Sequence, residues 1–129
     1  MKFTANQKYF FYPDINGNLD LPEGERLSVE IVRPTAEERD SICWYESVPR
    51  GLGTDGAIRI RYNASLILRE KTGAIKNLSV TDNAGKDRPV NSGAELAGAS
   101  FTGMVALVNA ICAEVCSDHI TEAQKKISG

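Results

Sequence analysis

The segment VEIVRPTAEERD, residues 29–40, predicts a β-strand that ends at a proline and leads directly into a capped α-helix. From Leu27 to Ile31 apolar side chains alternate with polar ones, which is the pattern of a strand with one buried face. Pro34 has no backbone N–H to donate to a sheet, so the strand must end there. Thr35 and Glu38 have the spacing of a capping box, in which each side chain accepts a hydrogen bond from the other residue's N–H. The segment therefore predicts where one strand ends and where one helix begins.

The residues before this segment predict a strand that pairs with it. Residues 9–12, YFFY, have high strand propensity. Asn16 and Gly17 form the strongest short turn signal, and residues 27–32 would be the returning strand. We therefore expect a β-hairpin or a small antiparallel sheet over residues 1–34.

Helical patterns follow the junction. The first helix is expected to continue to about Ser47. A second helix is expected from residue 58, because Ile58, Tyr62 and Leu66 recur at a spacing of four. Gly73 is expected just past its C-terminus, where glycine is common.

Residues 75–91 predict less regular structure. Residues 75–80 fit a short strand or an irregular segment that packs on the core. Residues 81–91 are polar and contain Asn83, Gly85 and Pro89, which are typical of turns.

A second capping box, formed by Ser92 and Glu95, opens the last long helix. This helix is expected to break near Gly98 and to continue to about Cys116. One of its faces is apolar through Met104, Val108, Ile111 and Val115, with Leu107 and Cys112 beside them. The final residues, 118–129, contain a third capping box and are expected to form a short helix or a frayed tail.

Together these patterns predict an α+β fold. A chain of 129 residues can form one domain with its own core, and its apolar and charged fractions, 42% and 25%, are those of a globular protein. We expect a single domain over residues 1–129. In it, the β-hairpin or small antiparallel sheet of residues 1–34 is followed by a compact bundle of about three to four helices over residues 35–129.

Charge, hydropathy and cysteine content narrow the functional classes. The net charge is −2 and the basic residues are scattered, which argues against a nucleic-acid partner. The N-terminus does not have the pattern of a signal peptide, and the apolar run at 101–115 is too short to span a bilayer, so no membrane partner is expected. Three cysteines without a secretory signal indicate reduced thiols and a cytoplasmic location.

Two motif-like stretches are better explained as loops. Residues 51–56, GLGTDG, match the G-x-G-x-x-G pattern, but no buried strand precedes them. Residues 14–25 carry oxygen-bearing side chains at the spacing of an EF-hand loop, but the position that must turn sharply is Leu19 instead of glycine. We therefore expect neither a nucleotide nor calcium, and no other cofactor.

The cysteines raise the question of a metal or catalytic site. Cys112, Cys116 and His119 fall at i, i+4 and i+7, and Cys43 could complete a zinc site, but no C-x-x-C pair supports one. A Cys/His dyad would also need His119, and such dyads are normally assembled from separate elements. We interpret the cysteines as core residues and acidic pairs such as residues 37–38 as first-turn charges. No catalytic residue and no metal ligand is therefore expected.

Five residues are candidates for contacts with a protein partner. Trp44 and Tyr45 could be surface anchors, although aromatic residues packed on the N-terminal hairpin are the more usual case. Met104, Leu107 and Ile111 could line an apolar groove for a partner helix. The alternative for this stripe is ordinary core packing, which its spacing favours.

The whole pattern resembles the small tail assembly proteins of long-tailed bacteriophages and prophages, particularly the tail assembly chaperones. The resemblance is carried by the aromatic-rich N-terminal hairpin, by the block VEIVRPTAEER at residues 29–39, and by the compact helical remainder. In those proteins a short β element leads into helices through a junction of the type R-P-T/L-x-x-E.

The resemblance implies a non-enzymatic assembly factor in the cytoplasm of the bacterial host. Such proteins bind the long helical tape-measure protein, help to recruit tail-tube subunits and tend to self-associate. They carry no catalytic residues, and none is transferred to this chain. Two alternatives stay open: a structural neck or tail-completion protein of the virion, and a small accessory protein that binds a metal through its cysteines and histidine.

Overall fold

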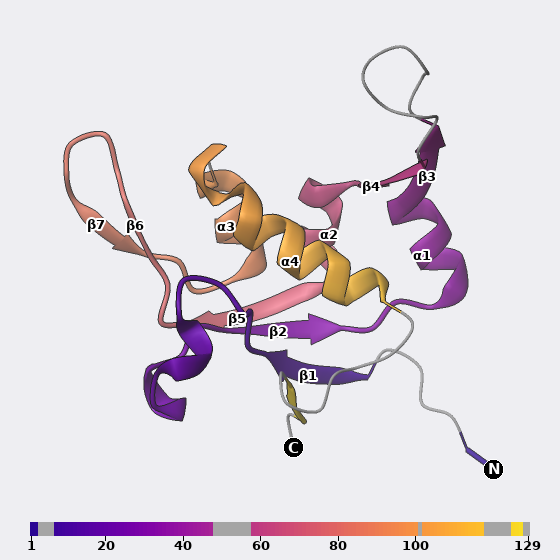
Figure 1. The fold of residues 1–129 in the computed structure, drawn as a ribbon, viewed down its shortest axis with the longest axis horizontal. Coiled ribbons are helices and arrows are strands. Elements are labelled where there is room, and N and C mark those ends of the chain that lie inside the picture. The colour runs from indigo at the N-terminus through magenta and orange to yellow at the C-terminus, as the bar shows by residue number, and fades with distance from the viewer. Residues whose placement is uncertain (3–6, 48–57, 101, 118–124, 128–129) are drawn as a thin grey trace.

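The computed structural model describes residues 1–2, 7–47, 58–100, 102–117 and 125–127. Within these ranges the chain forms an antiparallel sheet in the order β5–β2–β1–β8, a group of helices, and the separate hairpins β3–β4 and β6–β7 (Figure 1). The strands are β1 (Lys8–Phe11), β2 (Ser28–Val32), β3 (Cys43–Ser47), β4 (Ile58–Tyr62), β5 (Thr72–Lys76), β6 (Ser79–Thr81), β7 (Asp87–Pro89) and β8 (Lys125–Ile127). The helices are α1 (Ala36–Ile42), α2 (Ala64–Glu70), α3 (Gly93–Ala99) and α4 (Val105–Cys116), with 3-10 turns η1 (Asn18–Asp20), η2 (Glu23–Glu25) and η3 (Thr102–Met104). This arrangement confirms the predicted α+β class.

The centre of the sheet is the predicted antiparallel pair of strands, β1 and β2. Tyr9 lies opposite Ile31 and Phe11 lies opposite Val29, while Val29 also faces Ile75 of β5. These five side chains are buried, and the alternation along each strand puts them on one face. The period-2 pattern of the sequence therefore marks the face that carries the core.

The connection between β1 and β2 is longer than a tight hairpin turn. Asn16 and Gly17 have left-handed backbone with φ of 47° and 75°, as the turn signal predicts, and the 3-10 turns η1 and η2 follow. Asn18 closes this excursion: its Nδ2 donates to the carbonyls of Pro13 and Leu27 at 2.9 and 3.0 Å, and its Oδ1 accepts from the Leu27 N–H at 2.7 Å. This buried amide holds the excursion against the start of β2.

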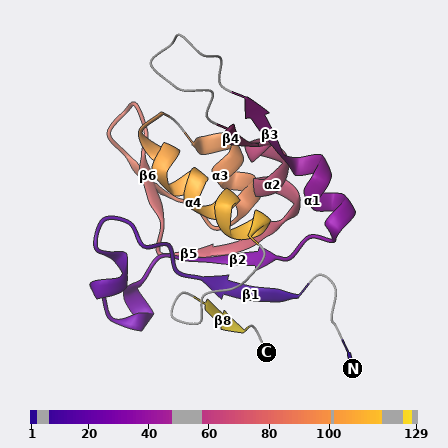
Figure 2. The ribbon, with the colours of Figure 1, turned by 45° about the vertical axis from the view of Figure 1, so that its right-hand side comes forward.

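The helices cover one face of the sheet (Figure 2). Ile111 and Val115 of α4 belong to the same core cluster as the buried side chains of β1 and β2, together with Leu96 of α3 and Ile67 of α2. On the other face, Lys76 lies 4.6 Å from the centre of the Phe10 ring. Within the described ranges, every helix is too short or too polar to span a membrane.

Two predicted helix starts are visible as hydrogen bonds. Thr35 Oγ1 accepts from the Glu38 N–H at 3.1 Å, and Glu38 Oε1 accepts from the Thr35 N–H at 2.8 Å. Ser92 Oγ accepts from the Glu95 N–H at 3.1 Å, but the Glu95 carboxylate accepts from Asn91 at 2.7 Å instead of from Ser92. The break between α3 and α4 confirms the predicted interruption. The third predicted capping box lies outside the described residues.

Four segments differ from the sequence prediction. The first helix ends at Ile42, and residues 43–47 form β3. Residues 58–62 form β4 because they pair with β3 instead of joining the helix α2. Gly73 lies inside β5 and not directly after the end of α2, which is capped by Lys71. Residues 125–127 form β8 at the edge of the sheet, where they pair with β1, instead of a last helix or a frayed tail.

Residues 75–80 agree with the strand alternative, since they contain the end of β5 and the start of β6. Residues 81–91 contain the predicted turn, but residues 87–89 form strand β7, because they pair with β6. Asp82 organises this turn, since its carboxylate accepts from the N–H groups of Ala84 and Lys86 at 2.9 and 3.0 Å. Residues 35–129 therefore contribute strands as well as helices.

Candidate functional site

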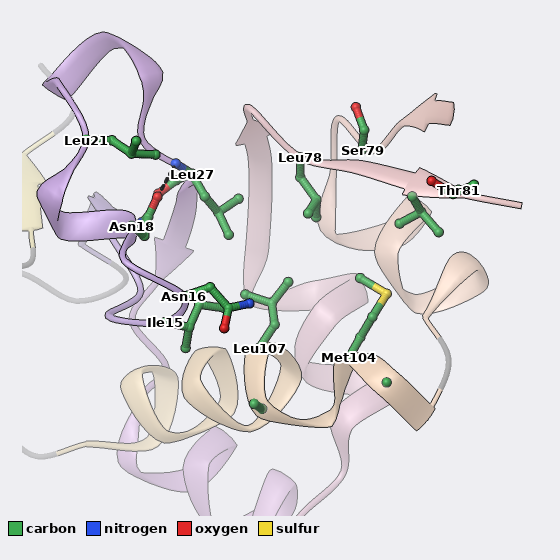
Figure 3. A pocket seen from close by; sticks show the side chains of 13 residues that line it. Ile15, Asn16, Asn18, Leu21, Leu27, Leu78, Ser79, Thr81, Met104 and Leu107 are labelled. Atoms are coloured by element: carbon green, nitrogen blue, oxygen red, sulfur yellow. Dashed lines mark hydrogen bonds between the residues drawn. The ribbon is translucent and has the colours of Figure 1, made fainter. Parts of the chain in front are cut away.

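An apolar groove lies between the β1–β2 excursion, strand β6 and the start of α4 (Figure 3). Its volume is about 430 Å³. The walls come from residues 15–27, 78–81 and 103–107, which are far apart in the sequence. Such a groove exists only in the folded chain, because three separate segments build it.

Apolar side chains form most of the groove. Figure 3 shows Met104 of η3 and Leu107 of α4 pointing toward Leu78, with Leu27 on the side of the excursion. Leu27 and Leu107 are buried, Met104 and Leu78 are half-buried, and Leu21 is 42% exposed. The groove therefore has a packed floor and an accessible apolar rim.

Few polar groups in the groove are available to a ligand. The amide of Asn18 is used by the backbone of Pro13 and Leu27. Exposed Asn16, with Ser79 and Thr81 on β6, supplies the remaining polar lining. This chemistry suits apolar side chains with a few hydrogen bonds at the edge, and the flexible Met104 can adapt to different shapes.

The five partner-binding candidates from the sequence fall into three places. Met104 and Leu107 line the groove. Ile111 is 0% exposed and lies in the core, so it cannot touch a partner while the fold is intact. Trp44 and Tyr45 lie on a different surface, the hairpin β3–β4.

Trp44 and Tyr45 are exposed, at 48% and 68% of their surface. The interpretation that they pack as buried aromatics on the N-terminal hairpin is therefore wrong. Within the described residues β3 pairs only with β4, so that Trp44 lies opposite Arg61 and Tyr45 opposite Ile60. In Figure 1 this hairpin lies near the C-terminal end of α4, away from the groove at the N-terminal end.

The three cysteines are buried core residues, as predicted. Burial raises the pKa of the Cys112 and Cys116 thiols to about 12, so both are protonated at neutral pH and are poor nucleophiles. In the part of the chain that the structure describes, no three Cys, His, Asp or Glu residues gather in a way that could hold a metal ion. His119 lies outside that part.

The glycine-rich motif and the acidic pair of the sequence show no functional site in the described residues. Residues 51–56 lie outside the described residues. Glu37 and Glu38 are in the first turn of α1, as predicted. Glu38 also pairs with the ammonium group of Lys71, and this hydrogen bond holds the pKa of the Glu38 carboxyl below its usual value. This pair joins α1 to the end of α2 and has a structural role.

A buried polar cluster between the sheet and α4 escaped the sequence analysis. The Tyr9 hydroxyl donates to Glu114 Oε2, and both residues are buried. Arg33 Nη1 donates to the Glu114 carbonyl at 2.9 Å and to Ser117 Oγ at 3.2 Å, at the helix C-terminus, where a cation is favourable. The sequence signal that could have revealed this cluster is Glu114, a charged residue beside the buried positions Cys112 and Val115.

No family model matches the chain, and no curated protein or solved structure is significantly similar to it. The likeness to phage tail assembly proteins stays a hypothesis drawn from the sequence pattern.

Proposed function

We propose that this protein is a non-enzymatic assembly factor for a phage or prophage tail. In this proposal it acts in the cytoplasm of the bacterial host and binds a helical segment of a tape-measure or tail-tube protein. The observation that carries the proposal is the apolar groove of about 430 Å³ at the start of α4. Met104 and Leu107, two of the candidates from the sequence, line this groove.

The groove fits the way in which amphipathic helices are recognised. Such a helix presents apolar side chains three or four residues apart, and these enter an apolar groove. Each large side chain that becomes fully buried contributes about 1.5–3 kcal/mol. Leu21, 42% exposed at the rim, can gain contacts when a partner side chain enters. A partner without such an apolar stripe would gain little here.

Binding measurements with a matched pair of variants test the proposal. The probe is a labelled helical segment of a phage tape-measure protein, and the readout is fluorescence anisotropy. Met104→Asp places a charge in the groove and should weaken binding at least tenfold. Val105→Asp is the control, because Val105 is the next residue, is 52% exposed and does not line the groove. Equal affinities of the two variants would contradict the proposal.

Analysis of purified particles separates an assembly factor from a virion component. An assembly factor should be absent from mature particles. Detection of the chain there in stoichiometric amount would instead favour a neck or tail-completion protein. A metabolic operon around the coding region, with no neighbouring gene for a long helical protein, would also count against the proposal.

A further inference from the structure

Two of the three buried cysteines meet where the hairpin β3–β4 joins the helices. Cys43 is the first residue of β3, and Cys116 is the last residue of α4. Their thiols are joined by a hydrogen bond. Figure 1 shows the hairpin near the C-terminal end of α4. The fold therefore holds two sulfur atoms from distant parts of the sequence in contact.

The third cysteine is placed less favourably for a bond to Cys116. Cys112 lies four residues earlier on the same helix. Side chains at this spacing have Cβ atoms about 5–6 Å apart, whereas a disulfide needs a Cβ–Cβ distance of about 3.5–4.5 Å. Helix geometry thus opposes a bond between Cys112 and Cys116, and Cys43 on a separate element is the better partner.

Both cysteines lie at the ends of secondary-structure elements. Cys43 follows α1 with extended backbone, at φ of −144° and ψ of 144°. Cys116 ends α4, and Ser117 after it is also extended. Element ends make fewer backbone hydrogen bonds than element interiors, so the small shift that brings two contacting sulfurs to bonding distance disturbs little.

We propose that Cys43 and Cys116 form a reversible disulfide when the protein meets a peroxide, and that this bond fastens the base of the hairpin β3–β4 to the end of α4. Two thiols and one hydrogen peroxide give one disulfide and two water molecules. In the first step the deprotonated Cys43 sulfur attacks one peroxide oxygen. The O–O bond breaks, Cys43 becomes a sulfenic acid, and the released hydroxide takes up a proton as water.

The second step closes the disulfide. The Cys116 sulfur attacks the sulfur of the sulfenic acid, and the S–O bond of Cys43 breaks. The hydroxyl group takes the proton of the Cys116 thiol and leaves as the second water molecule. The hydrogen bond between the two thiols places the attacking sulfur beside its target before the reaction begins.

Exposure and acidity identify Cys43 as the thiol that reacts first. Cys43 is 8% exposed, whereas Cys112 and Cys116 are 0% and 3% exposed. Burial raises the pKa of Cys112 and Cys116 to about 12, so neither supplies a thiolate at neutral pH. In the described residues β3 pairs only with β4, and a two-stranded hairpin is marginally stable, so local opening admits peroxide at Cys43.

Peroxide treatment of the folded full chain, followed by alkylation in urea and mass spectrometry, tests the proposal. The number of free thiols should fall from three to one, and peptide mapping without reductant should find Cys112 alkylated and the other two cysteines linked. Cys112→Ala is the matched control and should form the same bond, whereas Cys116→Ala should form no intramolecular disulfide. Circular dichroism checks that both variants fold, and dithiothreitol should restore all three thiols of the wild type.

Stability gives a second readout that needs no variant. A bond that the folded state favours must stabilise the folded state in turn, and the bond also restricts the unfolded chain between residues 43 and 116. The midpoint of urea unfolding should therefore lie about 2 M higher for the oxidised chain than for the reduced chain. A chain oxidised in urea should contain mixed pairings, because the fold no longer brings the two thiols together.

Three results would overturn the proposal. The first is a folded chain that keeps all three thiols under peroxide conditions that oxidise the chain in urea. The second is a disulfide that includes Cys112, and the third is an oxidised chain whose urea midpoint is not raised. The groove takes no part in this bond, so Met104→Asp should be oxidised like the wild type. A failure of the groove proposal can thus be told apart from a failure of this one.

Discussion

Replacement of Tyr9 by phenylalanine tests whether the buried polar cluster stabilises the contact between the sheet and α4. Tyr9 is 0% exposed, and its hydroxyl donates to Glu114 Oε2. Phenylalanine keeps the ring and its packing, so only the hydroxyl is lost. Glu114, which is 8% exposed, would then keep a buried carboxylate oxygen without this donor.

The size of the effect follows from that lost donor. A hydrogen bond to a charged group contributes about 1.5–3 kcal/mol, and an unsatisfied buried acceptor costs a similar amount. We therefore expect Tyr9→Phe to lower the free energy of unfolding by about 2 kcal/mol at neutral pH. With an m-value of about 1.5 kcal/mol/M in urea, the midpoint of unfolding should fall by about 1.3 M.

The raised pKa of Tyr9 leads us to expect a loss of stability at alkaline pH. Burial, followed by the hydrogen bond to Glu114, raises the pKa of Tyr9 above its usual value. The pKa of Tyr9 is about 10 in the unfolded chain and higher in the folded chain. The stability that Tyr9 contributes is therefore complete below about pH 10. It is lost as the pH rises toward the folded-state pKa. The wild type should therefore lose stability above about pH 10, and Tyr9→Phe should lose less.

Urea denaturation at neutral and alkaline pH measures both effects. Tyr12→Phe is the matched control, because the Tyr12 hydroxyl lies 3.4 Å from Glu23 Oε1 in a less buried pair. The control should stay within about 0.5 kcal/mol of the wild type. A Tyr9→Phe variant that is no less stable than Tyr12→Phe at neutral pH would refute a stabilising role of the Tyr9 hydroxyl.

Other perturbations give equally specific expectations. A Cβ at Gly93 would overlap a carbonyl oxygen of α2, so Gly93→Ala should lower the free energy of unfolding by about 3 kcal/mol. Gly98 lies in the same helix, and a Cβ there meets nothing within 4 Å, so Gly98→Ala should raise the free energy of unfolding by about 0.5–1 kcal/mol. Urea denaturation measures both changes. The hydrogen bond from Lys71 lowers the pKa of Glu38. The stability that the ionised Glu38 contributes is therefore present above the unfolded pKa of about 4.3 and is lost as the pH falls. Glu38→Gln should accordingly flatten the decline of the urea midpoint below about pH 5. Because burial raises the pKa of Cys112 to about 12, its thiol should react with Ellman's reagent at pH 8 or so only after urea has unfolded the chain.

Local signals made the strand–proline–helix junction predictable. Pro34 and the capping box of Thr35 and Glu38 act within a few residues, and both hydrogen bonds of the box are present. The hairpin β3–β4 was not predictable in this way. Ile58 and Tyr62 fit a spacing of four as well as an alternation through Ile60, and pairing with β3 decides between the two. That pairing is a tertiary contact, which a local pattern does not contain.

The groove was predictable only in part, for a related reason. The apolar stripe predicted for the last long helix includes Met104 and Leu107, which line the groove. It also included Ile111, because the stripe continues past the groove into the core. Where the groove ends is decided by the excursion at residues 15–27 and by β6, which lie far from α4 in the sequence. The spacing of apolar residues on one helix cannot encode the position of those walls.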